Sequence, residues 1–195
     1  MQKIPTLFKR DYEGTRLVYN ELVEGTEWVA AGEGVATAKV DGTSCLVKGG
    51  TLYKRYDAKT GRTPPDGFIP AQEEPDAVTG HWPGWLAVGD GPEDKWHREA
   101  WQDVATRKPG ASDWTYELVG PKVQGNPYNF SKHALWPHGD LILLPDPPRT
   151  FDGLRQWMIE HPAIEGIVWW RDLAAVDCDK VKLKRRDYGL AWPDK

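Results

Sequence analysis

Short runs of β-prone residues, separated by turns that contain glycine, dominate the first part of the chain. The runs cover residues 27–31, 35–40, 44–47 and 51–56. The segment Lys48-Gly49-Gly50 joins the last two runs and is typical of a tight hairpin connection. The pattern therefore predicts an antiparallel meander in this region.

The middle of the chain changes character. Prolines and glycines oppose regular structure in residues 60–92, which we interpret as an ordered surface insertion with short strands near residues 68–69 and 85–88. Apolar residues then recur at helical spacing in residues 93–105, and Pro109-Gly110 ends the pattern. The inner face of this predicted helix consists of Trp96, Ala100, Trp101 and Val104.

The second half of the chain predicts more strands and one further helix. Large apolar residues alternate with Thr115 and Glu117 in residues 114–119, which is the pattern of a half-buried strand. Thr150 is suited to cap a helix that Pro162 ends. The remaining predicted strands are residues 141–144, 166–170 and 180–184. Together these elements predict an α+β fold with antiparallel β-sheets flanked by helices.

Length and composition narrow the class of protein. A chain of 195 residues, of which 39% are hydrophobic, fits one domain over residues 1–195. No apolar run approaches the roughly 20 residues that a membrane-spanning helix needs, and residues 1–19 carry no secretory signal pattern. The two cysteines, Cys45 and Cys178, are too few for a disulfide framework. We expect a cytoplasmic protein with no membrane partner.

The positions of the charged residues along the chain are more informative about its binding partner than the net charge is. A formal net charge of -4 argues at first against a nucleic-acid-binding protein, because such domains usually carry a basic field. The charge is segregated, however, and basic residues gather in residues 48–62 and 180–186. The net charge therefore does not exclude a polyanionic substrate.

The sharpest local motif is Lys39-Val40-Asp41-Gly42-Thr43, at the end of one predicted strand. Residues two apart in an extended segment point the same way, so Lys39 and Asp41 share a face, and Gly42 allows a tight backbone path. A lysine with the usual pKa of about 10.4 is a poor nucleophile at neutral pH, so a reactive Lys39 needs desolvation or a neighbouring cation. Taken alone, the motif also fits a plain Asp-Gly turn with a solvated lysine.

Four further motifs follow in order along the chain. They are Lys54-Arg55-Tyr56-Asp57, Tyr116-Glu117-Leu118-Val119-Gly120, Glu165-Gly166-Ile167-Val168 and Val181-Lys182-Leu183-Lys184. The five motifs in this order resemble the covalent nucleotidyltransferase superfamily of polynucleotide ligases and mRNA capping enzymes. The local sequence of residues 34–43, 52–56, 117–122 and 125–128 looks most like that of the ATP-dependent RNA ligases that join 5'-phosphate to 3'-hydroxyl ends.

The resemblance implies a minimal nucleotidyltransferase domain without an OB-fold, which acts on RNA ends with ATP and Mg²⁺ or Mn²⁺. It implies that Lys39 attacks the α-phosphorus of ATP and holds AMP as a covalent lysyl phosphoramidate. The nucleotide-binding residues that it implies are Lys39, Asp41, Arg55, Glu117, Lys182 and Lys184. The metal-binding residues that it implies are Glu165, Asp41 and Glu117.

Each of these residues also has a purely structural interpretation when it is taken alone. Lys182 and Lys184 could guard the solvated face of an edge strand. Glu117 could be the exposed half of an alternation, Glu165 could cap a turn, and Arg55 could serve only a salt bridge. Two other functions stay open: a GTP-using capping-type nucleotidyltransferase, and a module on the same fold that binds RNA or nucleotide without turnover.

Other reactive residue types do not form a recognisable site. The five histidines show no metal-ligand spacing, and we interpret His133 and His138 as loop residues. Cys45 fits a small core residue. Ala38, directly before Lys39, offers no polar side chain to adenine, so backbone groups or a nearby residue such as Thr37 would have to serve.

Overall fold

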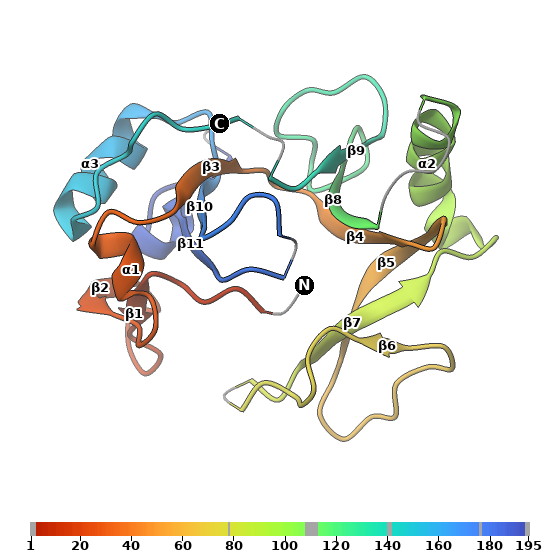
Figure 1. Ribbon diagram of the computed structural model, residues 1–195, viewed down its shortest axis with the longest axis horizontal. Helices are drawn as coiled ribbons and strands as arrows, with labels where there is room; N and C mark the ends of the chain where they lie inside the picture. The colour runs from red at the N-terminus through yellow and green to blue at the C-terminus, as the bar shows by residue number, and fades with distance from the viewer. Residues whose placement is uncertain (1–2, 78, 108–112, 140–141, 176, 194–195) are drawn as a thin grey trace. The chain divides into compact units, whose positions relative to one another are not determined.

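The computed structural model describes residues 3–77, 79–107, 113–139, 142–175 and 177–193, with the backbone only for residues 103–107. The chain forms two compact units, each with its own hydrophobic core (Figure 1). Unit 1 consists of Met1–Lys3 and Asp41–His138, and unit 2 consists of Ile4–Val40 and Gly139–Lys195. The single domain over residues 1–195 stays a prediction. The α+β class with antiparallel sheets is confirmed.

Unit 1 contains a six-stranded antiparallel sheet with the strand order β6-β7-β5-β4-β8-β9. The strands are β4 (Thr43–Lys48), β5 (Thr51–Ala58), β6 (Ile69–Pro70), β7 (Trp82–Ala87), β8 (Trp114–Val119) and β9 (Ala134–Pro137). The predicted hairpin is confirmed, because β4 and β5 pair across Gly49 and Gly50, whose φ values are 55° and 75°. Glycine adopts such positive φ values without steric cost.

One face of this sheet packs against helix α2 (Lys95–Arg107), which follows the short 3-10 helix η1 (Pro92–Asp94). The helix predicted for residues 93–105 is thereby confirmed, with its first turn in 3-10 form. The core of unit 1 consists of Cys45, Val47, Leu52, Ala100, Tyr116, Leu118, Val123 and Leu135. The Val104 side chain and the Pro109-Gly110 stop lie outside the described residues.

Unit 2 contains a three-stranded antiparallel sheet with the order β11-β10-β3, and a separate pair of strands, β1 and β2. The strands are β1 (Phe8–Arg10), β2 (Val18–Leu22), β3 (Val35–Lys39), β10 (Gly166–Trp170) and β11 (Lys180–Lys184). The helices are α1 (Glu27–Ala30), α3 (Phe151–Glu160) and the 3-10 helix η2 (Arg185–Tyr188). Both β10 and β11 have the bounds that the sequence predicts.

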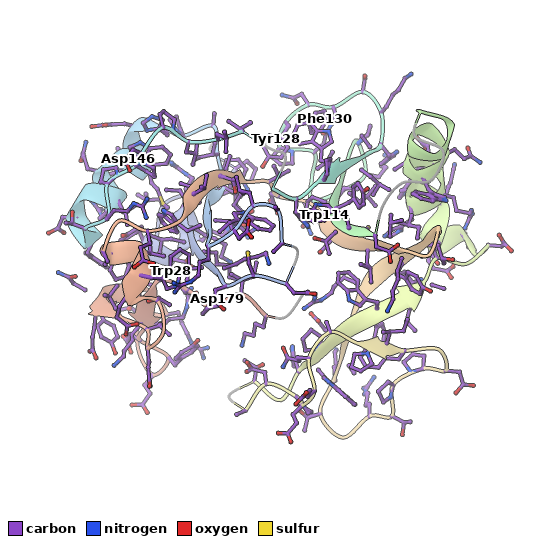
Figure 2. The ribbon with its side chains drawn as sticks, in the orientation of Figure 1. Trp28, Trp114, Tyr128, Phe130, Asp146 and Asp179 are labelled. Carbon is purple, nitrogen blue, oxygen red and sulfur yellow. The ribbon has the colours of Figure 1, made fainter. Side chains whose placement is uncertain are left out.

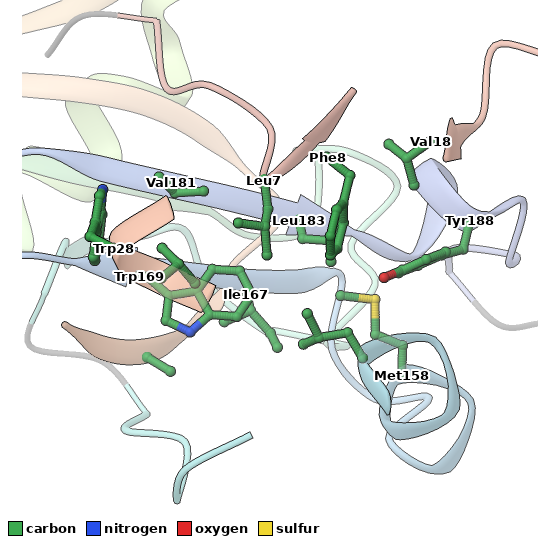
Figure 3. Packing of buried hydrophobic residues seen from close by; sticks show 13 residues of the cluster. Leu7, Phe8, Val18, Trp28, Met158, Ile167, Trp169, Val181, Leu183 and Tyr188 are labelled. Atoms are coloured by element: carbon green, nitrogen blue, oxygen red, sulfur yellow. The ribbon is translucent and has the colours of Figure 1, made fainter. Parts of the chain in front are cut away.

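The core of unit 2 lies on one face of this sheet. Ile167 and Trp169 of β10 and Val181 and Leu183 of β11 are buried there together with Met158 of α3 (Figure 3). Alternation along β11 therefore directs Val181 and Leu183 into the core, as predicted, and leaves the alternate lysines on the opposite face. The face that carries the lysines is the one on which the sequence predicts the site.

The predicted cap of α3 is confirmed. The Thr150 side chain accepts a hydrogen bond from the backbone N–H of Gly153 at 3.3 Å, and its φ of -91° and ψ of 154° are extended. This satisfies one of the backbone donors that the first turn of a helix leaves without an intrahelical partner. In the part of the chain that the structure describes, no helix is long and apolar enough to cross a membrane.

The strand predicted for residues 27–31 is wrong, because Glu27–Ala30 forms the helix α1. The buried hydroxyl of Thr26 donates to the carbonyl oxygens of Leu7 and Val23 at 3.1 Å and 2.7 Å, and this anchors the start of the turn. Tertiary contacts thus override the β propensity of a run too short to fix its own structure.

Two further expectations need correction. β3 does not join a meander with β4 but pairs with β10 in the other sheet. In residues 141–144, Leu141 lies outside the described residues, and the next two side chains are not buried: Ile142 and Leu143 are 59% and 61% exposed. This segment makes an isolated bridge from Leu143 to Thr37 instead of a buried strand.

Candidate active site

The candidate nucleophile lies on the face of the unit 2 sheet that is opposite its core. The central strand is β10, whose Gly166 pairs with Lys39 of β3 on one side and with Lys184 of β11 on the other. The next row on the same face consists of Thr37, Val168 and Lys182. Because cross-strand partners point to the same side of a sheet, the three lysines of these two rows share this face.

Gly166 is required by the close approach of β11. A Cβ atom at this position would lie 2.2 Å from the carbonyl oxygen of Leu183 and 2.8 Å from Cα of Lys184. Such distances are far inside van der Waals contact, so no larger residue fits without moving the strand. The glycine also leaves no side chain between Lys39 and Lys184.

Lys39 and Glu165 form an ion pair. The distance from Lys39 Nζ to Glu165 Oε2 is 2.6 Å, and the two side chains are 23% and 8% exposed. The carboxylate therefore holds the ammonium of Lys39 in a partly desolvated position. It is also within reach to accept a proton from the Lys39 amine, and a lysine amine is nucleophilic only after it has lost a proton.

Lys182 lies in the same electrostatic environment. Burial lowers its pKa to about 8, and the positive charges of Lys184 and Lys39 add to the effect. Like charges that crowd together favour the neutral form of an amine, so an anion that binds among them is strongly favoured. This face of unit 2 thus has the electrostatics of a phosphate-binding surface.

The third row of the face is structural. Lys180 Nζ lies 4.6 Å from the ring centroid of Trp170, a cation–π contact. Trp170 Nε1 donates to Thr37 Oγ1 at 3.0 Å, and Thr37 Oγ1 donates to the carbonyl oxygen of Val168 at 3.2 Å. The Thr37 hydroxyl is thus engaged within the protein, which disfavours it as the contact to adenine.

Two other predicted residues, Arg55 and Glu117, lie on one face of the unit 1 sheet. Ser44 of β4 pairs with Glu117 of β8, and Cys45 pairs with Lys54. Cys45 points into the core, so Ser44 and Arg55, one residue away on each strand, point to the opposite face. The structure therefore places Arg55 and Glu117 on the same side of unit 1, with β4 between their strands.

Glu117 also contacts the Gly42 turn of the first motif. A Cβ atom on Gly42 would lie 2.3 Å from the carbonyl oxygen of Leu118 and 2.7 Å from Cγ of Glu117. Gly42 is therefore required because β8 and its carboxylate side chain pass directly over the turn. Glu117 is buried and is not the exposed half of an alternation.

Asp41 is anchored through its backbone. Its N–H donates to the hydroxyl of Tyr128 at 2.8 Å, and the ring of Tyr128 contacts Phe130 with 5.6 Å between centroids (Figure 2). Phe130 in turn meets Trp136 edge-to-face at 4.8 Å. The loop between β8 and β9 thus holds the backbone of Asp41, where the part of the first motif that belongs to unit 1 begins.

The two basic residues of the second motif have different surroundings. Lys54 binds the buried carboxylate of Asp94 at 2.6 Å and has a structural role. Arg55 lies on the other face, where its Nε donates to Asp57 at 3.1 Å and its guanidinium stands 5.3 Å from the ring centroid of Trp85. Arg55 is 22% exposed, and its position is compatible with a contact to a nucleotide.

The predicted metal ligands divide between the units, with Glu165 in unit 2 and Asp41 and Glu117 in unit 1. Among the residues that the structure describes, no group of three or more His, Cys, Asp or Glu side chains is arranged to hold a metal ion. Mg²⁺ commonly takes one or two protein carboxylates together with the phosphates of a substrate. A single carboxylate such as Glu165 fits that mode of binding, and the metal-binding residues stay predictions.

One residue near the predicted site was missed. His138 follows β9, and its Nε2 lies 2.8 Å from Glu117 Oε2. His138 lies in a turn, as expected of a loop histidine, and no spacing in the sequence connects it to Glu117. By contrast, His133 has a structural position: it is buried, binds Glu99 at 2.9 Å and stacks on Trp96.

Comparison with known protein families points to RNA ligases, as the sequence motifs do. A family model described as RNA ligase 1 matches residues 109–195. That segment contains Glu117, Glu165, Lys182 and Lys184, whereas Lys39 and Arg55 precede it.

Curated relatives extend the match further toward the N-terminus. RNA ligase 1 of Danio rerio is 37% identical over 86 residues, which cover 40% of this chain and 25% of that protein. RNA ligase 1 of Mus musculus is 28% identical over an alignment of 227 positions, which covers 82% of this chain and 68% of the relative. The protein of the same name from Rattus norvegicus gives the same identity and coverage. These comparisons confirm the resemblance that the motifs indicate: the chain is similar to the RNA ligase 1 proteins.

Proposed function

We propose that this chain is an ATP-dependent RNA ligase that joins a 5'-phosphate to a 3'-hydroxyl through a covalent lysyl-AMP intermediate. The observation that carries the proposal is the arrangement around Lys39. Its amine lies 2.6 Å from Glu165 and shares a sheet face with Lys182 and Lys184. A lysine nucleophile, a proton acceptor and two phosphate-binding cations are the groups that the first step requires.

In the first step, the proton of the Lys39 ammonium passes to Glu165 or to solvent, and the nitrogen lone pair attacks the α-phosphorus of ATP. The N–P bond forms as the P–O bond to pyrophosphate breaks. Negative charge accumulates on the non-bridging oxygens, and Lys182 and Lys184 are suited to stabilise it. The product is AMP linked to Lys39 as a phosphoramidate.

Two further displacements complete the reaction. An oxygen of the RNA 5'-phosphate attacks the phosphorus of the lysyl-AMP, and the N–P bond breaks to return the lysine amine. The RNA 3'-hydroxyl then attacks the activated 5'-phosphate, forms the phosphodiester and releases AMP. Each step exchanges one bond at phosphorus for another, so no oxidant or reductant is needed.

Mg²⁺ or Mn²⁺, when bound, would neutralise charge on the phosphates of the nucleotide. Glu165 is the carboxylate of unit 2 that would hold it, and Asp41 and Glu117 are those of unit 1. Arg55 and Glu117 keep the nucleotide-binding roles that the resemblance implies. A nucleotidyltransferase fold is the scaffold that these roles presuppose.

The decisive experiment measures covalent labelling. The protein is incubated with ATP or GTP labelled at the α-phosphate, with Mg²⁺ or Mn²⁺, and is denatured before label on the chain is counted. We expect label from ATP that is lost in Lys39→Ala and retained in Lys48→Ala, a variant of an exposed lysine outside the site. Label from GTP alone would identify a capping-type enzyme. No label, or label unaffected by Lys39→Ala, would contradict covalent catalysis and favour a binding module.

A second experiment tests the substrate. The wild type is offered 5'-phosphorylated RNA as a nick, a stem-loop and a single strand, together with DNA of the same sequence. We expect sealing of RNA, with Lys39→Ala inactive throughout. Sealing of DNA but not RNA would overturn the assignment to RNA ends.

A further inference from the structure

His138 contacts Glu117, a predicted nucleotide-binding residue, on the face of the unit 1 sheet that is opposite its core. Its backbone N–H donates to the carbonyl oxygen of Thr115 at 2.9 Å, which extends the pairing of β8 with β9 by one residue. Thr115 and Glu117 are two apart on β8 and so point to the same face. His138 therefore lies beside Glu117 in the adjacent row.

The bond between the two side chains has a defined direction. His138 Nε2 lies 2.8 Å from Glu117 Oε2, and both side chains are largely buried, with 15% and 11% exposure. Nδ1 of His138 is buried and has no hydrogen-bond partner among the described residues. A carboxylate oxygen only accepts hydrogen bonds, so Nε2 of His138 carries the hydrogen and donates it to Glu117 Oε2.

The surrounding face carries unused hydrogen-bonding capacity. Besides His138 Nδ1, the hydroxyls of Ser44 and Thr115 are buried without a hydrogen-bond partner among the described residues. Ser44 is the cross-strand partner of Glu117, and Thr115 is two residues before it on the same strand. Buried polar atoms are normally satisfied, so three unsatisfied atoms around one carboxylate point to a missing polar ligand.

We propose that His138 is a positioning residue for Glu117, which holds Oε2 and leaves Oε1 directed toward the Gly42 turn. The Oε1 position follows from Gly42, where an added Cβ would lie 3.2 Å from that atom. With one oxygen held, the carboxylate loses rotational freedom and is pre-organised for a hydroxyl-bearing ligand. This inference rests on the proposed function, because it takes the ligand of Glu117 to be the nucleotide.

The test compares two substitutions of His138. His138→Gln keeps an N–H donor near the position of Nε2, whereas His138→Leu removes the donor at similar volume. The ATP concentration that gives half-maximal adenylylation of Lys39 is measured together with the maximal rate. For His138→Leu we expect that concentration to rise about tenfold, the usual range for a lost hydrogen bond to a charged group, with little change in maximal rate. His138→Gln should stay within about threefold of wild type.

A double substitution separates positioning from general damage. If His138 acts through Glu117, His138→Leu should no longer raise the half-saturating ATP concentration when Glu117→Gln is already present, because the two residues work as one unit. His133→Leu removes another histidine of unit 1 that is paired with a carboxylate, and it serves as the control. It should lower the melting temperature without changing the half-saturating ATP concentration. A penalty that persists undiminished with Glu117→Gln, or a His138→Leu variant equal to wild type, would overturn the inference.

Failure of the ligase proposal leaves this test intact. If wild type accepts no label, equilibrium dialysis with ATP and Mg²⁺ measures nucleotide affinity directly. Weaker binding in His138→Leu but not in His138→Gln would then still support positioning of Glu117. Equal affinities in all three proteins would refute it.

Discussion

Lys39 and Lys184 pair with the same residue, Gly166, from opposite sides of β10. The glycine has no side chain to separate them, and the backbone of β11 lies where a larger residue would place its Cβ atom. One residue without a side chain thus lies between two lysines. This accounts physically for the glycine in the Glu165-Gly166-Ile167-Val168 motif.

The first prediction concerns the ion pair of the nucleophile. Glu165→Gln keeps the size of the side chain but removes the charge that faces Lys39 Nζ. The lysine then lacks its proton acceptor, so we expect the rate of Lys39 adenylylation to fall about 100-fold or more. Single-turnover labelling with ATP measures the rate. Glu160→Gln, at the exposed end of α3, is the control, and a Glu165→Gln rate within threefold of wild type would argue against this role.

The second prediction concerns the charge of Lys182. Its pKa of about 8 means that Lys182 loses its positive charge as the pH rises through that value. We expect the affinity for ATP to weaken between pH 7 and pH 9, and Lys182→Arg to weaken less because arginine stays protonated. Equilibrium dialysis at several pH values measures this. Parallel curves for the two proteins would rule Lys182 out as the source.

The third prediction concerns how the stability of the protein depends on pH. The lowered pKa of Lys182 determines whether stability rises or falls with pH. The pKa of Lys182 is lowered from 10.5 to about 8 on folding, so between these values the unfolded chain binds more protons than the folded one. The contribution of Lys182 to the free energy of unfolding therefore rises with pH across this window. Urea unfolding of wild type and Lys182→Met at several pH values measures it. The wild-type curve should gain on the variant as pH rises, and a constant difference would contradict the expectation.

The fourth prediction concerns Gly166. Gly166→Ala places a methyl group 2.2 Å from the Leu183 carbonyl oxygen, and β11 must move to accommodate it. We expect a loss of about 1–3 kcal/mol in the free energy of unfolding, the usual cost of overpacking. Gly89→Ala is the matched control, since its added Cβ would lie 3.6 Å from Asp94 Oδ2, an ordinary van der Waals distance. Equal stability of the two variants would show that β11 adjusts freely.

The fifth prediction concerns the cap of α3. Thr150→Ala removes the acceptor for the Gly153 N–H, and we expect it to cost about 1 kcal/mol of stability. Thr150→Ser keeps the hydroxyl and should recover most of the loss. Chemical denaturation of the three proteins decides the matter, and a Ser variant as unstable as Ala would point to the lost methyl group instead.

Strong local patterns predicted β8, β10 and β11 with their observed bounds. In β11 the alternation of lysine with valine and leucine specifies which side chains enter the core, and the structure agrees. The Lys48-Gly49-Gly50 hairpin was equally predictable, because positive φ values select glycine. These features depend on residues close together in sequence.

Long-range partners were not predictable in the same way. Nothing local in β3 indicates that it pairs with β10 and not with its sequence neighbour β4. The exposed Ile142 and Leu143 have the composition of a core strand, and only the tertiary structure shows that they are outside it. His138 was missed for a related reason, since its partner Glu117 is 21 residues away on another strand.

The ion pair of Lys39 joins residues 126 positions apart, and nearly all of unit 1 is encoded between them. During synthesis, β3 leaves the ribosome long before β10 and β11 exist. A chain interrupted anywhere in residues 44–138 carries the lysine motif but lacks the carboxylate of Glu165 and the lysines at positions 182 and 184. The charged face is therefore assembled only in a chain translated through residue 184, and an unfinished product has Lys39 without the charged groups that surround it.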